Sequence, residues 1–189
     1  MTISFEPVSA IILEKLSRTK RSKQQLLLEI VNDNRFIPIE LGLIDGGKTA
    51  IAKGNKMNTN KKNTLQLAKE LNKRNIDVIF LPESNDVPSA DAIIRYRGKL
   101  MIAEFKFSNT TKENTLYSDL KDGFKKAPVV VLKLSNMDLG VFSQTISQLV
   151  RKTEIIGDIL LINDMGIETF ISKEKFRNGS YKNKIKGFL

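Results

Sequence analysis

The sequence predicts an α/β domain with a mixed central sheet and flanking helices. Helical segments with an apolar face alternate with short apolar runs of strand length, and two such runs are joined by a short turn. The chain has 189 residues, of which 41% are hydrophobic, enough to fill a sizeable core. We expect an N-terminal extension of helices and a strand over residues 1–45, followed by one compact domain over residues 46–189.

The elements follow from the apolar patterns in chain order. In the extension we expect short helices near residues 8–16 and 26–31, and over residues 36–43 a strand at a sheet edge, because Pro38 cannot donate to a ladder. In the domain we expect helices over residues 60–72, 111–126 and 138–152, and strands over residues 76–81, 91–96, 99–107, 129–134, 159–162 and 167–171. We expect the basic stretch 172–189 to fray or to lie along a polyanion.

Composition limits the chemistry that is open to the chain. There are 31 Lys and Arg against 21 Asp and Glu, and the resulting charge of +10 most often serves a polyanion such as nucleic acid. The absence of cysteine and histidine excludes disulfides, thiolate nucleophiles, imidazole acid-base chemistry and imidazole metal ligands. Catalysis would therefore depend on carboxylates, amines, hydroxyls or a hard cation. No apolar run approaches the length of about 18 residues that a membrane span requires.

A basic stripe covers residues 46–69, which contain no acidic residue. We expect this stripe to guide a nucleic-acid substrate, although a solvated surface would have the same composition. The lysines expected to bind nucleic acid are Lys48, Lys53, Lys56, Lys61 and Lys62.

The most informative segment is the pair of strands around Arg97-Gly98. With a two-residue turn at this position, Asp91 faces Glu104 across the hairpin. Directly opposed residues have Cβ atoms about 4.5 to 5.5 Å apart, so two carboxylates repel each other unless a positive charge lies between them. A divalent cation would supply that charge.

Lys106 extends this cluster. It lies two residues after Glu104 and on the same face of the strand, whereas Ala103, Phe105 and Phe107 point to the other face and are expected in the core. Phosphodiester hydrolysis uses such a group, because Mg²⁺ or Mn²⁺ held by carboxylates activates water and a lysine stabilises charge on the phosphate. The alternative is a strand with a charged outer face, which a tripeptide as common as Glu-x-Lys also permits.

These residues resemble the PD-(D/E)XK nuclease signature. Asp91 stands in a Ser-Ala-Asp sequence in place of Pro-Asp, and Glu104-x-Lys106 follows on the next strand. The resemblance implies a nuclease core of the restriction-endonuclease-like type. It also implies an active site formed by Glu83, Asp91, Glu104 and Lys106, with the three acidic residues as metal ligands.

Over residues 63–106, the sequence resembles the toxin nuclease domain at the C-terminal ends of bacterial contact-dependent inhibition proteins and related polymorphic toxins. The resemblance continues more loosely through the following strands and helix, and residues 1–45 fall outside it. It implies a metal-dependent tRNA nuclease that acts in the cytoplasm and has a cognate immunity protein as partner.

Other interpretations stay open. The same site could cleave DNA, or the protein could bind nucleic acid without cleaving it, with structural charges in the hairpin. Residues 42–49 satisfy the P-loop pattern G-x-x-x-x-G-K-[ST], but Gly54 and Asn55 interrupt the helix that should follow, which disfavours nucleotide hydrolysis. Glu70 could join the metal site or pair with Lys73 or Arg74. Five aromatic residues could stack on bases or pack in the core: Tyr96, Tyr117, Phe124, Phe176 and Tyr181.

Overall fold

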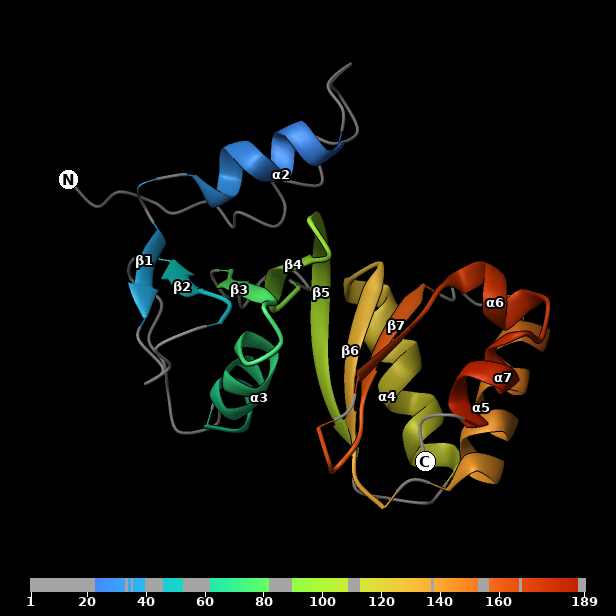
Figure 1. Ribbon diagram of the computed structural model, residues 1–189. Coiled ribbons are helices and arrows are strands. Elements are labelled where there is room, and N and C mark those ends of the chain that lie inside the picture. The colour runs from blue at the N-terminus through green and yellow to red at the C-terminus, as the bar shows by residue number, and fades with distance from the viewer. Residues whose placement is uncertain are drawn as a thin grey trace. The chain divides into compact units, whose positions relative to one another are not determined.

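The computed structural model describes residues 23–32, 34, 36–39, 46–52, 62–81, 90–108, 113–136, 138–152, 157–166 and 168–186. Helices alternate with strands along the chain, as the sequence predicts for the mixed α/β class (Figure 1). The chain divides into two compact units, Met1–Ile102 and Ala103–Leu189. The expected helix near residues 8–16 lies outside the described residues, and the expected boundary at residue 46 stays a prediction.

The first unit contains two described helices and the strands that pair around them. The helices are α2 (Lys23–Val31) and α3 (Lys62–Asn72), and the strands are β1 (Phe36–Ile39), β2 (Thr49–Ala52), β3 (Asp77–Phe80), β4 (Ala92–Tyr96) and the start of β5 (Lys99–Ser108). β1 is antiparallel to β2, β2 is parallel to β3, and β3 is antiparallel to β4. α3 packs on β3, with Leu67, Ala68 and Leu71 buried.

The turn between β4 and β5 confirms the expected two-residue connection. Arg97 and Gly98 both have positive φ, at 49° and 77°, as the hairpin turns that match strand twist require. At the start of β5, the side-chain amide of Gln24 pairs with the backbone of Leu100. Its Nε2 donates to the carbonyl at 2.7 Å, and its Oε1 accepts from the N–H at 3.0 Å. Helix α2 is thereby attached to the first unit.

The second unit contains the end of β5 and seven further elements. These are α4 (Glu113–Lys126), β6 (Val129–Leu134), α5 (Leu139–Arg151), β7 (Asp158–Ile162), β8 (Glu168–Ile171), α6 (Lys173–Arg177) and α7 (Tyr181–Lys186). β5, β6 and β7 are parallel neighbours, and β8 runs antiparallel to β7. The helices and strands expected over residues 111–171 are confirmed to within two residues at each end.

The core of this unit forms between the sheet and its helices, and α4 and α5 pack against each other (Figure 1). Apolar residues spaced at helical intervals on both helices meet alternate residues of β6 and β7. The buried set includes Leu116, Leu120 and Phe124 of α4, Phe142, Ile146 and Leu149 of α5, and Val130, Leu132, Ile159 and Leu161 of the strands. Asp138 caps α5 by accepting from the N–H groups of Gly140 and Val141 at 2.7 and 3.1 Å.

The C-terminal stretch forms two helices and does not fray over residues 173–186, and the alternative expectation that it lies along a polyanion stays a prediction. Residues 173–186 form α6 and α7, and Phe176, Tyr181 and Ile185 are each at most 3% exposed. The rings of Phe176 and Tyr181 pack 5.4 Å apart between centroids. The six basic residues of this stretch dominated the sequence pattern, but three apolar residues attach both helices to the core.

Candidate functional site

Glu104 is a charged residue in the core of the second unit. It lies on β5, pairs with Val130 of β6, and is 2% exposed. Ala103 and Phe105, its neighbours on the strand, point to the opposite face and are also buried. Phe107, expected in the core with them, is 39% exposed near the end of β5. Burying a carboxylate costs several kcal/mol unless partners compensate for the lost hydration, so the surroundings of Glu104 need an explanation.

Two lysines supply that compensation at one carboxylate oxygen. Glu104 Oε1 lies 3.2 Å from the ammonium of Lys106 and 2.9 Å from that of Lys126, at the end of α4. The side chains of Lys106 and Lys126 are 20% and 36% exposed, so both ammonium groups lie between the core and solvent. The three groups together carry one net positive charge, which suits a phosphate.

The second oxygen of the carboxylate is in a different situation. Glu104 Oε2 is buried and has no hydrogen-bond partner in the described part of the chain. Buried polar atoms almost always have a partner, so this atom is a candidate ligand. Carboxylate oxygens are the ligands that Mg²⁺ and similar hard cations prefer, and the chemistry of this atom therefore fits the expected metal.

Gly123 explains how α4 comes close enough to contribute to the site. A Cβ added at this position would lie 2.8 Å from Cγ2 of Val130 and 3.6 Å from Cε of Lys106. The Cβ would be too close to the Val130 side chain, whereas its contact with Lys106 would be an ordinary one. The close approach places the last turn of the helix, with Lys126, over Glu104.

Two carboxylates of α4 add to the electrostatics around Lys106. Burial raises the pKa of Asp119, with the ammonium of Lys106 opposing the shift and the charge of Asp122 adding to it. The pKa of Asp122 is lowered, mainly by Lys125, which donates to it at 2.8 Å, and to a smaller extent by Lys106. Lys106 is therefore influenced by negative charge from both its own strand and the helix above.

Lys126 was not among the residues expected from the sequence. It lies 22 positions after Glu104, and only the packing of α4 on the sheet brings the two together. A signal was present in the pair of basic residues, Lys125 and Lys126, that ends a helix directly following the Glu-x-Lys strand. The apolar positions of the helix indicate whether Lys125 or Lys126 points toward the sheet.

The structure places Asp91 and Glu104 in separate units, so their expected pairing across the hairpin stays a prediction. Asp91 is partly buried directly before β4, and its carbonyl accepts from the N–H of Leu81 at 2.9 Å. Glu83 lies outside the described residues. Among the described residues, no group of three acidic side chains is arranged to hold a metal ion. The expected Glu83, Asp91 and Glu104 ligand set is therefore still to be tested.

Glu70 remains a candidate ligand by sequence alone. Arg74, one helical turn later in the chain, donates from its guanidinium to the backbone carbonyl of Glu70. This contact uses the main chain of Glu70, so the expected pairing of its carboxylate with Lys73 or Arg74 stays a prediction.

The P-loop pattern has a structural explanation. Thr49 begins strand β2, where a P-loop would begin a helix. The N–H of Gly47 donates to the carbonyl of Asn72 at 2.6 Å, and the N–H of Lys48 donates to Asp77 Oδ1 at 2.8 Å. The Thr49 hydroxyl donates to Asn72 Oδ1 at 2.6 Å. These groups, which would bind phosphate in a P-loop, are thus engaged within the protein.

The two glycines of this segment have a packing role. A Cβ on Gly46 would lie 2.5 Å from the carbonyl oxygen of Asn72, and one on Gly47 would lie 2.4 Å from that of Ile76. The glycines are therefore needed for the segment to approach the end of α3. This disfavours the NTPase interpretation further.

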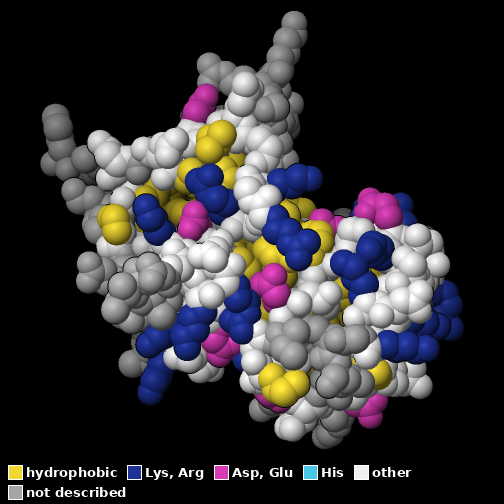
Figure 2. Space-filling view, viewed as in Figure 1, with side chains coloured by type: hydrophobic (Ala, Val, Ile, Leu, Met, Phe, Trp, Pro, Cys, Tyr) yellow, Lys and Arg dark blue, Asp and Glu magenta, His cyan; other side chains and the backbone are white. Residues whose placement is uncertain are grey.

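Of the expected nucleic-acid-binding lysines, Lys48 and Lys62 are exposed, as that role requires. Lys53, Lys56 and Lys61 lie outside the described residues. Figure 2 shows basic side chains in several separate groups on the visible face, with fewer acidic side chains among them. A guiding role for the basic stripe stays a prediction.

Most of the aromatic candidates serve the core. Tyr96, Phe124, Phe176 and Tyr181 are at most 6% exposed. Tyr117 is partly buried, and the ammonium groups of Lys121 and Lys152 lie 5.9 and 4.8 Å from its ring centroid. Its cation–π contacts account for its position without a bound base.

Comparisons with known proteins add one structural neighbour. A chain of the CdiA-CT/CdiI toxin and immunity complex from Burkholderia pseudomallei is 17% identical, with a TM-score of 0.46, over 66% of this chain and 98% of that chain. Neither a protein-family model nor a curated protein sequence matches the chain. None of the described helices combines the length and the apolar character that crossing a membrane would need.

Proposed function

We propose that the protein is a metal-dependent nuclease that hydrolyses RNA, with tRNA as the expected substrate. The environment of Glu104 carries the proposal: one buried oxygen is held by two lysines, and the other has no partner in the described part of the chain. This arrangement brings a ligand for a hard cation and two groups that can stabilise phosphate charge to one place. The net charge of +10 supports a polyanionic substrate.

In this proposal, Glu104 Oε2 would hold Mg²⁺ or Mn²⁺, with Asp91 and Glu83 as the other expected ligands. The bound ion would supply an activated water and polarise the phosphate. Lys106 would exchange part of its contact with Glu104 for a non-bridging phosphate oxygen, where its charge stabilises the negative charge that develops during hydrolysis. Lys126 would hold the carboxylate in its orientation from the other side.

The toxin role is part of the proposal and depends on the sequence resemblance. A nuclease toxin of this kind would act in the cytoplasm of a target cell and would be neutralised by an immunity protein. The absence of cysteine and histidine is compatible with the mechanism, because no step uses either residue.

The test is cleavage by the purified full chain. Transfer RNA, other single-stranded RNA and duplex DNA would each be incubated with Mg²⁺, with Mn²⁺ and with EDTA. We expect tRNA cleavage that requires the metal, and a loss on the order of a hundredfold or more in Glu104→Gln and in Lys106→Ala, by analogy with other preorganised catalytic groups.

Glu168 offers a matched control for Glu104. It lies on β8 in the same unit and also has a buried carboxylate oxygen without a hydrogen-bond partner among the described residues. Glu168→Gln should retain activity. Full activity of Glu104→Gln, or cleavage in EDTA, would refute the assigned site. Cleavage of duplex DNA alone would mean that the substrate is DNA in place of RNA. Binding of nucleic acid without cleavage under any condition would favour a non-catalytic binding module.

A further inference from the structure

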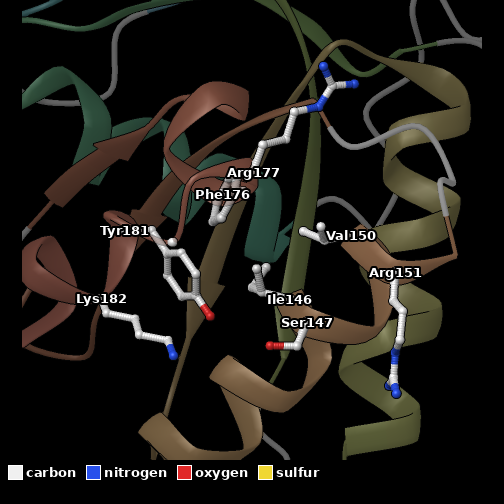
Figure 3. Close-up of a pocket in the computed structure, with 9 residues that line it drawn as sticks. Ile146, Ser147, Val150, Arg151, Phe176, Arg177, Tyr181 and Lys182 are labelled. Atoms are coloured by element: carbon white, nitrogen blue, oxygen red, sulfur yellow. The ribbon is translucent and has the colours of Figure 1, made fainter.

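A second candidate site is a pocket in the second unit where α5 meets α6 and α7 (Figure 3). Its volume is about 520 Å³, within the range of about 300 to 1,000 Å³ that is typical of small-molecule sites. None of its lining residues belongs to the Glu104 site.

One side of the pocket is apolar. Ile146 and Val150 line it from α5, one helical turn apart, and the rings of Phe176 and Tyr181 line it from α6 and α7. Ile146, Phe176 and Tyr181 are at most 3% exposed, so the wall belongs to the rigid core of the unit. Val150 is only partly buried, and it is therefore the residue of this wall that the flat or apolar part of a ligand could contact.

The rest of the lining is basic. Arg151, Arg177 and Lys182 contribute three positive charges, and no acidic residue lines the pocket. All three side chains are exposed, and within the described part of the chain none of them forms an ion pair. On α6, the pKa of Glu174 is held low mainly by hydrogen bonds from its own backbone N–H and from Ser172, with Arg177 contributing least. The three cations are therefore available to a ligand.

The polar groups are arranged on two levels (Figure 3). Lys182 directs its amine toward the hollow. The hydroxyl groups of Tyr181 and Ser147 also point there, but they donate to the backbone carbonyl of Ser143 at 3.5 and 2.8 Å. The guanidinium groups of Arg177 and Arg151 lie at the edge and point outward. A ligand would thus meet an amine inside and further positive charge at the rim.

We propose that this pocket binds one nucleotide, with its phosphate against Lys182, its base and ribose against Val150, and the positive charges of Arg177 and Arg151 at the rim. Inorganic phosphate would satisfy the cations and leave the apolar wall uncovered, whereas a nucleotide combines an anion with a ring in one molecule. The nucleotide is free or part of an RNA strand. If the nucleotide is part of an RNA strand, the pocket would bind the substrate at a position distant from the bond that is cleaved. That assignment rests on the proposed function.

The experiment follows the methyl resonances of Ile146 and Val150 in the full chain by NMR. The probes are adenosine 5′-monophosphate, adenosine, inorganic phosphate and a hexa-adenylate RNA, the last in EDTA. We expect saturable shifts of both methyl signals with the nucleotide, and affinities about tenfold weaker with adenosine or phosphate alone, since each probe lacks one half of the interaction. Shifts caused by both the nucleotide and the RNA would assign the pocket to a strand, and shifts caused by the nucleotide alone would assign it to a free nucleotide.

Three variants locate the site. Arg177→Gln with Lys182→Gln should weaken binding about tenfold, since the phosphate loses its contact with Lys182 and the positive charge of Arg177 at the rim. Ser147→Trp fills the hollow from an exposed position on α5 without changing any charge, and should weaken binding at least as much. Lys175→Gln with Lys186→Gln removes the same charge from the same two helices outside the pocket lining and should bind like the wild type.

The proposal is overturned if neither the nucleotide nor the RNA shifts these methyl groups, if inorganic phosphate binds as tightly as the nucleotide, or if the control pair weakens binding as much as the pocket pair. These outcomes are distinct from failure of the proposed nuclease. A protein that binds the nucleotide but cleaves no RNA would retain the pocket and lose the nuclease. A protein that cleaves RNA, but whose pocket variants bind the nucleotide and the RNA like the wild type, would support the nuclease and overturn the pocket.

Discussion

The ammonium of Lys126 lies 2.9 Å from Oε1 of Glu104, although the two residues are 22 positions apart in the chain. Lys106 reaches the same oxygen at 3.2 Å, so a single buried carboxylate connects two lysines. The sequence suggested that removing Glu104 would relieve its repulsion with Asp91. The structure instead indicates that removal would leave two neighbouring ammonium groups without their shared counter-charge.

We therefore predict that Glu104→Ala lowers the free energy of unfolding by about 2 to 3 kcal/mol. This is at or below the loss of about 3 to 5 kcal/mol found when one partner of a fully buried ion pair is removed, because the side chains of Lys106 and Lys126 are 20% and 36% exposed. Urea unfolding followed by circular dichroism would measure the loss. Glu168→Ala, in the same unit, should cost less because no described ion pair involves Glu168. Equal stability of Glu104→Ala and the wild type would show that the two lysines do not depend on this carboxylate.

Lys126 and Lys125 form a matched pair for testing the helix contribution. Lys126 contacts Glu104, whereas its neighbour Lys125 is exposed and pairs with Asp122 at 2.8 Å. We expect Lys126→Ala to lower the single-turnover cleavage rate about tenfold at saturating substrate, because Glu104 loses one of the groups that orient it. Lys126→Arg should restore most of the rate. Lys125→Ala should leave it unchanged, and equal effects of the two alanine variants would indicate a general loss of surface charge.

The helices and strands of the second unit could be predicted because their apolar periods are regular and their boundaries carry turn residues. Strand β2 was missed because Thr49–Ala52 is only four residues long and begins on the threonine of a Gly-Gly-Lys-Thr sequence that suggested a different motif. The C-terminal helices were missed for another reason. Their basic residues outnumber the three apolar ones that dock them, and docking depends on tertiary contacts.

The candidate site was predictable only where neighbours are close in sequence. Strand alternation places Glu104 and Lys106 on one face, and the structure confirms that they form an ion pair. The pair of basic residues at the end of α4 makes Lys126 a candidate, but its contact with Glu104 and the close approach at Gly123 depend on how α4 crosses the sheet, which no local pattern gives. The burial of Glu104 was likewise unexpected, since a strand with a charged outer face has the same sequence pattern.

The two aspartates of α4 should have opposite effects on stability. Burial raises the pKa of Asp119 above its ordinary value of 3.8, so the folded state binds more protons and stability falls as pH rises through the shifted pKa. Asp119→Asn should therefore be more stable than the wild type at neutral pH, and the difference should vanish below pH 3.8, where the carboxyl is protonated in both states.

Asp122 provides the comparison for Asp119. Lys125 lowers its pKa, so its charge contributes stability above the ordinary value of 3.8 that is lost as pH falls through the lower, folded-state pKa. Asp122→Asn should then be slightly less stable than the wild type at neutral pH, since the pair is exposed. Urea midpoints of both variants between about pH 3 and pH 7 measure these signs, because that interval spans the carboxyl titrations. A loss of stability at neutral pH in Asp119→Asn would contradict the assignment of burial as the dominant cause.

The last prediction separates a structural Gly-Gly-Lys-Thr segment from a nucleotide-binding one. Asn72 is 2% exposed and accepts from the Thr49 hydroxyl while donating to the carbonyl of Ile76 at 2.9 Å. Asn72→Ala should cost about 2 to 4 kcal/mol, because it leaves buried polar groups unpaired and opens a cavity.

Lys48→Ala should change stability by no more than about 0.5 kcal/mol, because this side chain is exposed. In a P-loop the sensitivities would be reversed, since the lysine contacts the phosphates and its loss abolishes nucleotide binding. Urea unfolding of both variants and an ATP titration of the wild type, with GTP in parallel, distinguish the two cases. Saturable ATP binding that disappears in Lys48→Ala would mean that the segment releases its contacts with Asn72 and binds phosphate instead.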